Sequence, residues 1–122
     1  RAAQEPAGAV MNDAAIDLVR RFGGILDAGR LAEIDELLAP DCRDHNPLPF
    51  QGPGRAGVAF KLAWYRALQP AARTRLVHLD VAADVVLAEW ITEHTGGGAS
   101  RYRGRFTIAG DRIAAFEVDR VG

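Results

Sequence analysis

The chain has 122 residues, of which 48% are hydrophobic and 25% are charged, and its formal net charge at pH 7 is -1. It is long enough for one domain with its own core, and the near-neutral charge gives no electrostatic reason to expect a nucleic acid or a membrane surface as partner. The charge therefore leaves a small molecule or a protein as the expected partner. The only cysteine, Cys42, excludes an intramolecular disulfide and a cysteine-built zinc site. We therefore expect the cytoplasm as the compartment.

The first third of the chain divides into a short extension and two helices. We expect residues 1–10 to be an extension or vector remnant, followed by a single domain over residues 11–122. From Asn12 to Leu26 apolar residues recur at helical spacing, which predicts an amphipathic helix. The pattern breaks at Gly29 and restarts as a second, shorter helix that stops before Pro40.

The rest of the chain predicts one more helix and then a sheet. The segment from Gly54 to Leu68 has helical periodicity and ends before Pro70. One face of this helix carries Phe60, Ala63, Trp64 and Ala67, and the other carries Lys61 and Arg66. Beyond Ala71, the segments 74–81, 84–94, 100–109 and 112–119 alternate partially and predict four antiparallel strands. Helices followed by hairpins indicate an α+β domain in which the helices cover one face of a curved sheet.

The last predicted hairpin gives a register that can be tested. If Gly110 and Asp111 form a two-residue turn, Tyr102, Glu117 and Asp119 all point to the inner face of the sheet. Gly104 then lies opposite Glu117, where it leaves room for a ligand or forms a bulge. The outer face would carry the row Arg101, Arg103 and Arg105, which belongs in water or at a protein interface rather than on a nucleic acid.

The order of elements from Asn12 to Asp119 resembles a known fold family. Three motifs carry the resemblance: LDAGRLAEIDELLAPDCRDHNP at 26–47, EHTGG at 93–97 and GDRIAAFEVD at 110–119. They are similar to the nuclear-transport-factor-2-like fold and, within it, to SnoaL-like polyketide cyclases and ketosteroid isomerase relatives. The resemblance implies three N-terminal helices on a curved, mainly antiparallel sheet that forms a cone around an apolar pocket. Because members include enzymes and proteins without catalysis, the fold alone does not choose a function.

Two carboxylates are the candidate catalytic groups. Burial in an apolar cavity would raise a carboxyl pKa towards neutrality, where it can exchange a proton with carbon. Asp119 matches the late aspartate that SnoaL-like cyclases use as acid and base, and Glu117 lies two residues before it on the same predicted face. The alternative is that both side chains lie at the open end of the strand and are solvated.

The stretch DHNP supplies candidate binding residues. In an extended segment Asp44 and Asn46 share a side, and in SnoaL-like cyclases these positions grip the oxygens of the substrate. The alternative is that both residues only start the turn that Pro47 continues. The resemblance places the ketosteroid isomerase base at Asn46, which cannot act as a base, so a steroid isomerase mechanism is not expected.

The remaining candidates are ring-bearing side chains near the expected pocket. His94 matches a histidine of the family's hairpin turn, although a lone hairpin histidine is often only exposed. Trp64 and Trp90 are expected to fill the core or the pocket wall, and Phe106 is expected on the inner face of the sheet with Tyr102. Because the three histidines lie in separate elements, we expect no metal site.

These observations predict an acid/base enzyme of the SnoaL-like cyclase or isomerase type, acting next to a carbonyl of a small apolar substrate without metal or organic cofactor. The alternative is a binding or structural protein of the same fold. We also expect a homodimer through the outer face of the sheet, because the apolar residues of the strands cannot all face the pocket. The residues predicted for that interface are Leu87, Ile91, Phe116 and Val118, with Arg103 and Arg105 near its edge.

Overall fold

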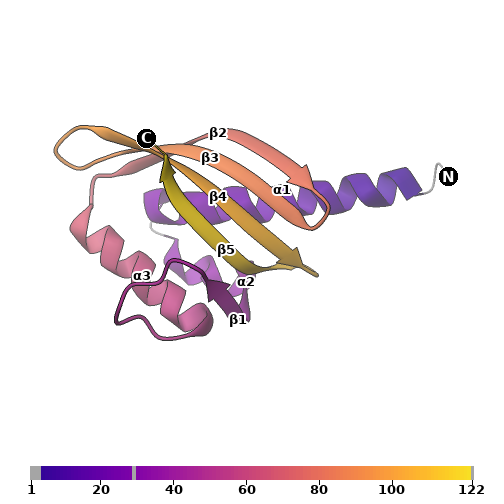
Figure 1. Ribbon diagram of the computed structural model, residues 1–122, viewed down its shortest axis with the longest axis horizontal. Coiled ribbons are helices and arrows are strands. Elements are labelled where there is room, and N and C mark those ends of the chain that lie inside the picture. Colours follow the sequence, from indigo (N-terminus) through magenta and orange to yellow (C-terminus); the bar gives the residue numbers. More distant parts are fainter. Residues whose placement is uncertain (1–3, 29, 122) are drawn as a thin grey trace.

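Helices cover one side of a bent five-stranded sheet in the computed structural model, which describes residues 4–28 and 30–121, with side chains for 13–25 and 30–121. The elements are α1 (Gln4–Ala28), the 3-10 turn η1 (Leu31–Glu33), α2 (Ile34–Leu37), β1 (Leu38–Asp44), α3 (Gly54–Leu68), β2 (Arg73–Ala82), β3 (Val85–Glu93), β4 (Ala99–Ala109) and β5 (Arg112–Val121). The strand order is β1-β5-β4-β3-β2 (Figure 1). The expected α+β class is confirmed, with β1 added parallel to β5 at one edge.

The helix boundaries differ from expectation at the N-terminus. The described part of residues 1–10, from Gln4 onwards, forms the first turns of α1, which project beyond the sheet (Figure 1). The origin of this segment as an extension or vector remnant stays a prediction. The second helix is only η1 followed by one turn of α2, and the chain is extended from Leu38 onwards. Pro40 therefore lies in an edge strand, where a missing N–H is tolerated. Helix α3 has the predicted bounds.

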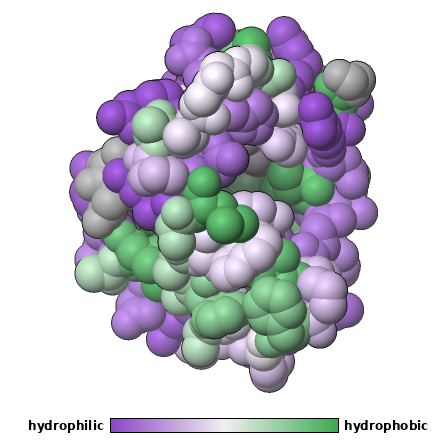
Figure 2. Space-filling view, turned by 90° about the vertical axis from the view of Figure 1, so that its left-hand side faces the viewer, coloured by the Kyte–Doolittle hydropathy of each residue, from purple (hydrophilic) through white to green (hydrophobic). Residues whose placement is uncertain are grey.

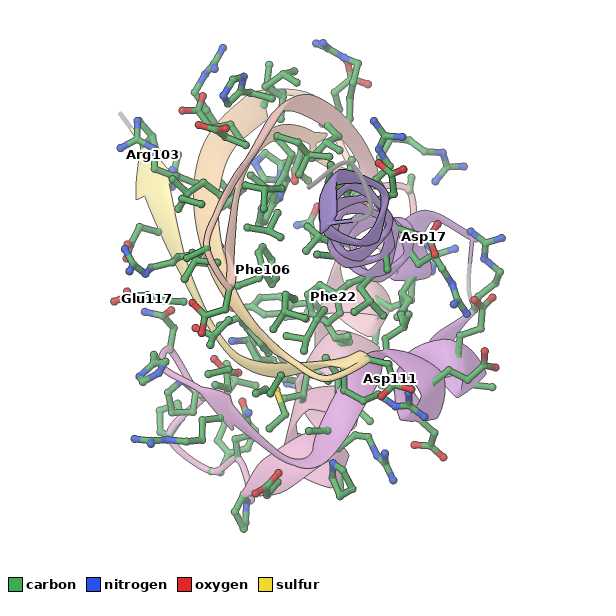
Figure 3. The ribbon with its side chains drawn as sticks, turned by 90° about the vertical axis from the view of Figure 1, so that its right-hand side faces the viewer. Asp17, Phe22, Arg103, Phe106, Asp111 and Glu117 are labelled. Carbon is green, nitrogen blue, oxygen red and sulfur yellow. The ribbon has the colours of Figure 1, made fainter. Side chains whose placement is uncertain are left out.

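The core lies between α1 and the inner face of the sheet. Figure 3 shows the strands curving around α1, with Phe22 and Phe106 pointing towards each other inside. Their ring centroids are 5.7 Å apart, and Phe106 stacks on Phe116 at 5.9 Å. Such aromatic contacts add to the stabilisation that burial of the rings supplies. The largest fully buried side chains are Phe106, Ile25, Leu37, Leu38, Ile113, Val58, Val86 and Cys42.

A bulge in β5 overturns the register predicted for the last hairpin. Ile108 pairs with Ile113 as expected, but Thr107 pairs with Ala115, so Ala114 is an extra residue on β5. One extra residue reverses the facing of every residue beyond it.

The reversal exchanges the two faces of β5. Phe116 and Val118 point inward, opposite Phe106 and Gly104. Glu117 and Asp119 are exposed on the outer face, opposite Arg105 and Arg103. Figure 3 shows Glu117 and Arg103 pointing away from the interior. The predicted inward orientation of Glu117 and Asp119 is therefore wrong.

The bulge also changes the outer face on which a dimer was expected. Leu87 and Ile91 remain there, partly exposed, but Phe116 and Val118 do not, so half of the predicted apolar patch is absent. Glu89 bridges Arg101 and Arg103 at 3.3 and 3.4 Å across neighbouring strands. Within the described residues, no helix is both long enough and apolar enough to span a membrane.

Candidate functional site

Asp44, at the end of β1, is a charged side chain held inside the protein. Its side chain is only 4% exposed. One carboxylate oxygen accepts the backbone N–H of Asn46 at 2.9 Å. The other accepts Nε2–H of Gln51 at 3.1 Å and the ammonium of Lys61 at 2.8 Å. Three donors from the 45–54 loop and α3 therefore converge on one carboxylate.

Lys61 reaches this site from α3. Its side chain is 12% exposed, and its Nζ also donates to the carbonyl oxygen of Asn46 at 2.8 Å. The same ammonium lies 6.0 Å from the centre of the Phe116 ring, a distance at which a cation is attracted to the ring face. Lys61 thus joins β1, the loop after it and the inner face of β5.

The hydrogen bonds keep the Asp44 carboxyl ionised. Burial by itself would raise its pKa, but hydrogen bonds from Lys61, Gln51 and the Asn46 N–H, together with the charge of Lys61, outweigh burial, and the net effect lowers the pKa. A carboxylate stabilised in this way is a weak proton acceptor. Asp44 therefore holds Lys61 in place and is poorly suited to be a base.

Asn46 takes part in a local turn, which is one of the two alternatives that its sequence context left open. Its backbone N–H bonds to Asp44 as in a local turn, while its side-chain Oδ1 accepts the N–H of Val118 at 2.8 Å across 72 positions of sequence. The turn therefore docks on β5. The side chain of Asn46 is exposed, and its predicted contact with a substrate stays a prediction.

A row of four rings follows the inner face of the sheet up to Lys61; we call Tyr102, Trp90, Phe106 and Phe116 the aromatic row. Trp90 stacks on Tyr102 at 6.3 Å and contacts Phe106 at the same distance, and Phe106 stacks on Phe116. Gly104 makes this possible, because a Cβ there would lie 2.7–2.8 Å from the rings of Phe106 and Trp90. The space that the sequence assigned to a ligand at Gly104 is filled by Trp90.

Polar groups lie at the hairpin end of the same inner face. His94 Nε2 is 2.8 Å from the hydroxyl of Ser100, which is buried, and Ser100 pairs in register with Thr92. Figure 2 views the molecule from this end and shows a hollow with hydrophobic residues gathered below it. His94 is half-buried, so it is not simply exposed on its hairpin.

Two further hollows lie elsewhere. A groove of about 720 Å³ runs between β1 and the loop after it, with Asp44, Gln51 and Cys42 among its lining residues. Burial, with the charges of Asp44 and Asp41 adding to it, raises the pKa of the Cys42 thiol to about 12, so the thiol is inert. A hollow of about 100 Å³ lies on the outer face and includes Glu117. Among the described residues, no cluster of His, Cys, Asp and Glu could hold a metal ion.

The structure brings together only some of the predicted residues. Tyr102, Trp90 and Phe106 form one row, and Asp44 and Asn46 form the neighbouring turn. Trp64 lies apart from both and is 36% exposed. Lys61 and Gln51 were missed. Lys61 gave no local signal in the sequence, because its partner Asp44 lies 17 positions earlier.

This architecture is that of a known protein family. The SnoaL-like domain family matches residues 19–116. The chain belongs to the SnoaL-like domain family. No functionally curated protein matches it.

Solved structures show the same NTF2-like fold at low sequence identity. A candidate polyketide cyclase from Bacillus cereus is 17% identical, with a TM-score of 0.80 over 88% of this chain and 74% of that one. IdmH from Streptomyces antibioticus, also a candidate polyketide cyclase, is 17% identical, with a TM-score of 0.76 over 87% and 91%. An NTF2-like protein of unknown function from Mesorhizobium loti is 23% identical, with a TM-score of 0.74 over 90% and 93%. At these identities the likeness establishes the SnoaL-like fold and leaves the chemistry to the site.

Proposed function

We propose that this SnoaL-like protein binds a small, largely apolar carbonyl compound on the aromatic row and acts on it by proton transfer, with Lys61 holding the carbonyl oxygen. The observation that carries the proposal is the position of the Lys61 ammonium, beside the inner ring of Phe116 and 12% exposed. An ammonium has three donors, and within the described residues Asp44 and Asn46 take two of them. The third is available to an oxygen.

Such a cation would stabilise the negative charge that develops on oxygen when a proton leaves the neighbouring carbon. Asp44 would keep the ammonium oriented while remaining ionised itself. The base would then be one of the other polar groups of the inner face. Among them we propose His94, because imidazole as a side-chain type can accept and donate protons near neutral pH. Tyr102, which stacks on Trp90, supplies a hydroxyl on the same face.

The second candidate is a binding protein without turnover. It is favoured by the placement of the carboxylates: Glu117 and Asp119 are exposed on the outer face, and Asp44 has a lowered pKa. An enzyme that uses a carboxylate as its base needs a carboxyl group whose pKa is raised. The two candidates share the same ligand contacts and differ only in proton transfer.

Binding is tested with 2-naphthol and naphthalene, which differ by one hydroxyl group. In a Trp64→Phe background, quenching of the remaining tryptophan, Trp90, reports occupation of the aromatic row. We expect 2-naphthol to bind about tenfold more tightly than naphthalene, because one charge-assisted hydrogen bond contributes about 1.5–3 kcal/mol. The additional change Asp44→Asn with Lys61→Met, which removes the pair together, should abolish that difference, whereas Lys61→Arg should keep part of it. Equal affinities in the parent protein would contradict the proposed role of Lys61.

Turnover is tested separately with 2-tetralone in deuterium oxide. NMR follows exchange of the protons next to the carbonyl, with buffer and the Asp44→Asn, Lys61→Met protein as references. An enzyme accelerates the exchange above both references and loses most of the acceleration in His94→Gln. Binding of 2-tetralone with exchange at the buffer rate identifies the non-catalytic candidate.

A further inference from the structure

Helix α3 exposes its apolar side and turns its charged side towards the protein. An amphipathic helix normally buries its apolar side and exposes its charges. In α3 the side chains that face away from the protein are all apolar and exposed: Ala56, Phe60, Ala63, Trp64 and Ala67. The three charged residues, Arg55, Lys61 and Arg66, are mostly buried. A helix with this pattern exposes the side that would ordinarily contact another protein surface.

The charged residues of α3 are already used within the chain. Arg55 bonds to the carbonyl oxygens of Asp35 and Leu38 and pairs with the Asp35 carboxylate at 3.2 Å. Lys61 pairs with Asp44, and Arg66 also has an interaction partner. None of the three is therefore positioned to face solvent beside the apolar side of the helix.

Phe50 extends this apolar surface from the loop before α3. Its ring contacts those of Phe60 and Trp64, with centroids 5.8 and 6.1 Å apart. Phe50 is 60% exposed, Phe60 49% and Trp64 36%. Three neighbouring aromatic rings with this exposure form a continuous patch, and such patches mark interaction sites on soluble proteins. We call Phe50 together with Ala56, Phe60, Ala63, Trp64 and Ala67 the α3 surface.

We propose that the α3 surface is the interface of a homodimer, in which α3 packs antiparallel on the α3 of a second copy across a two-fold axis. Positions 56, 60, 63 and 67 follow the 4-3-4 spacing of a helix-helix seam. Alanine at three of them allows close approach, and Phe60 supplies a knob. A two-fold axis brings each surface against itself, which suits a patch that carries no charge to complement.

The size of the patch fits a modest dimer. At roughly 200 Å² per aromatic side chain, the exposed parts of the three rings alone amount to about 300 Å² per copy. The alanines and the adjoining Leu68 and Tyr65, which are 56% and 40% exposed, enlarge the surface. Two copies together approach the lower end of the roughly 1,200–2,000 Å² that a specific interface buries. We therefore expect a dissociation constant in the micromolar range.

A membrane surface is a poorer occupant for this helix. Helices that lie on anionic membranes carry lysine and arginine on the side that faces the headgroups. The cations of α3 are instead held by Asp35, Asp44 and main-chain oxygens. The outer face of the sheet is also a poorer dimer surface, because Phe116 and Val118 are turned inward.

Single-cysteine cross-linking tests the proposal on the folded protein. Cys42 is 1% exposed and its thiol is inert, so it can stay. Ala63→Cys places a thiol near the middle of the seam, and Ala82→Cys places one at an exposed hairpin as the matched control. Under mild oxidation, Ala63→Cys should form disulfide-linked dimers at least tenfold faster than Ala82→Cys. Equal rates would overturn the proposed packing.

Sedimentation velocity between 1 and 100 μM gives the second test. The parent protein should pass from monomer to dimer, Phe60→Glu should shift the midpoint at least tenfold upward, and Leu87→Glu on the outer sheet face should leave it unchanged. A monomer throughout, or a dimer broken only by Leu87→Glu, contradicts the proposal. The last test is co-sedimentation with vesicles of phosphatidylcholine and phosphatidylglycerol. Co-sedimentation that depends on Phe60 would assign the surface to a membrane instead. Circular dichroism verifies that each variant is folded.

Discussion

Asp44 and Lys61 lie 17 positions apart in the sequence, and in the structure Oδ2 of one is 2.8 Å from Nζ of the other, with both side chains almost fully buried. Removing one partner of such a pair leaves the other charge without compensation. We predict that Lys61→Met lowers the free energy of unfolding by about 3 kcal/mol. Asp44→Asn with Lys61→Met together should cost less than Lys61→Met alone, as urea unfolding of the parent, both single variants and the double variant would show. Strictly additive effects of the two substitutions would mean that the pair does not interact.

The same pair predicts how stability depends on pH. The pKa of Asp44 is lowered in the folded state, so on acidification the unfolded chain takes up a proton there before the folded one does. The contribution of the pair is therefore complete above the ordinary aspartate pKa of ~3.9 and is lost as pH falls through the lower folded-state value. Urea unfolding from pH 6 down to pH 3 should show a shallower loss of stability in Asp44→Asn than in the parent. Parallel curves would show that Asp44 is not the group responsible.

Two glycines respond oppositely to the same substitution. Gly104→Ala forces a methyl group against Trp90 and Phe106, and overpacking of this kind costs about 1–3 kcal/mol. Gly23 lies in α1, and apart from its chain neighbours and the backbone of its own helix nothing lies within 4 Å of the position that a Cβ would take. Gly23→Ala should therefore stabilise the protein by roughly 0.5–1 kcal/mol. Thermal unfolding compares the two, and the near-ultraviolet circular dichroism of Trp90 should change only in Gly104→Ala.

Local sequence patterns were enough for α3 and the four antiparallel strands, but not for β1 or for the facing of the last strand. The bounds of α3 and the turn at Gly110 follow from periodicity and turn chemistry, and both are confirmed. The bulge at Ala114 has no such signal, because Ala114 and Ala115 are small enough to face either way. One undetected residue then exchanged Glu117 and Asp119 for Phe116 and Val118 on the inner face.

The candidate site was only partly predictable for a related reason. Helical periodicity gives the angle between Lys61 and the apolar residues of α3, but it does not say which side meets the body of the protein. That choice was made by pairs distant in sequence, Lys61 with Asp44 and Arg55 with Asp35. The polar groups of DHNP were recognisable as a turn, whereas their convergence on one cation depended on the tertiary fold.

The facing of β5 can be measured in solution, because the chain offers a silent background for thiol labelling. Cys42 is buried and its pKa is raised to about 12, so it should not react with a disulfide reagent at pH 8. A cysteine introduced on the outer face, as in Glu117→Cys or Asp119→Cys, should react at nearly the rate of a free thiol. Val118→Cys lies between these two positions but packs against the core, so its reaction should be at least tenfold slower. Fast reaction at Val118→Cys with protection at Asp119→Cys would restore the unbulged register, and with it the case for Asp119 as the base. The same outer-face positions give a functional control, because Asp119→Asn should leave both 2-naphthol binding and any 2-tetralone exchange unchanged, unlike the loss of Lys61.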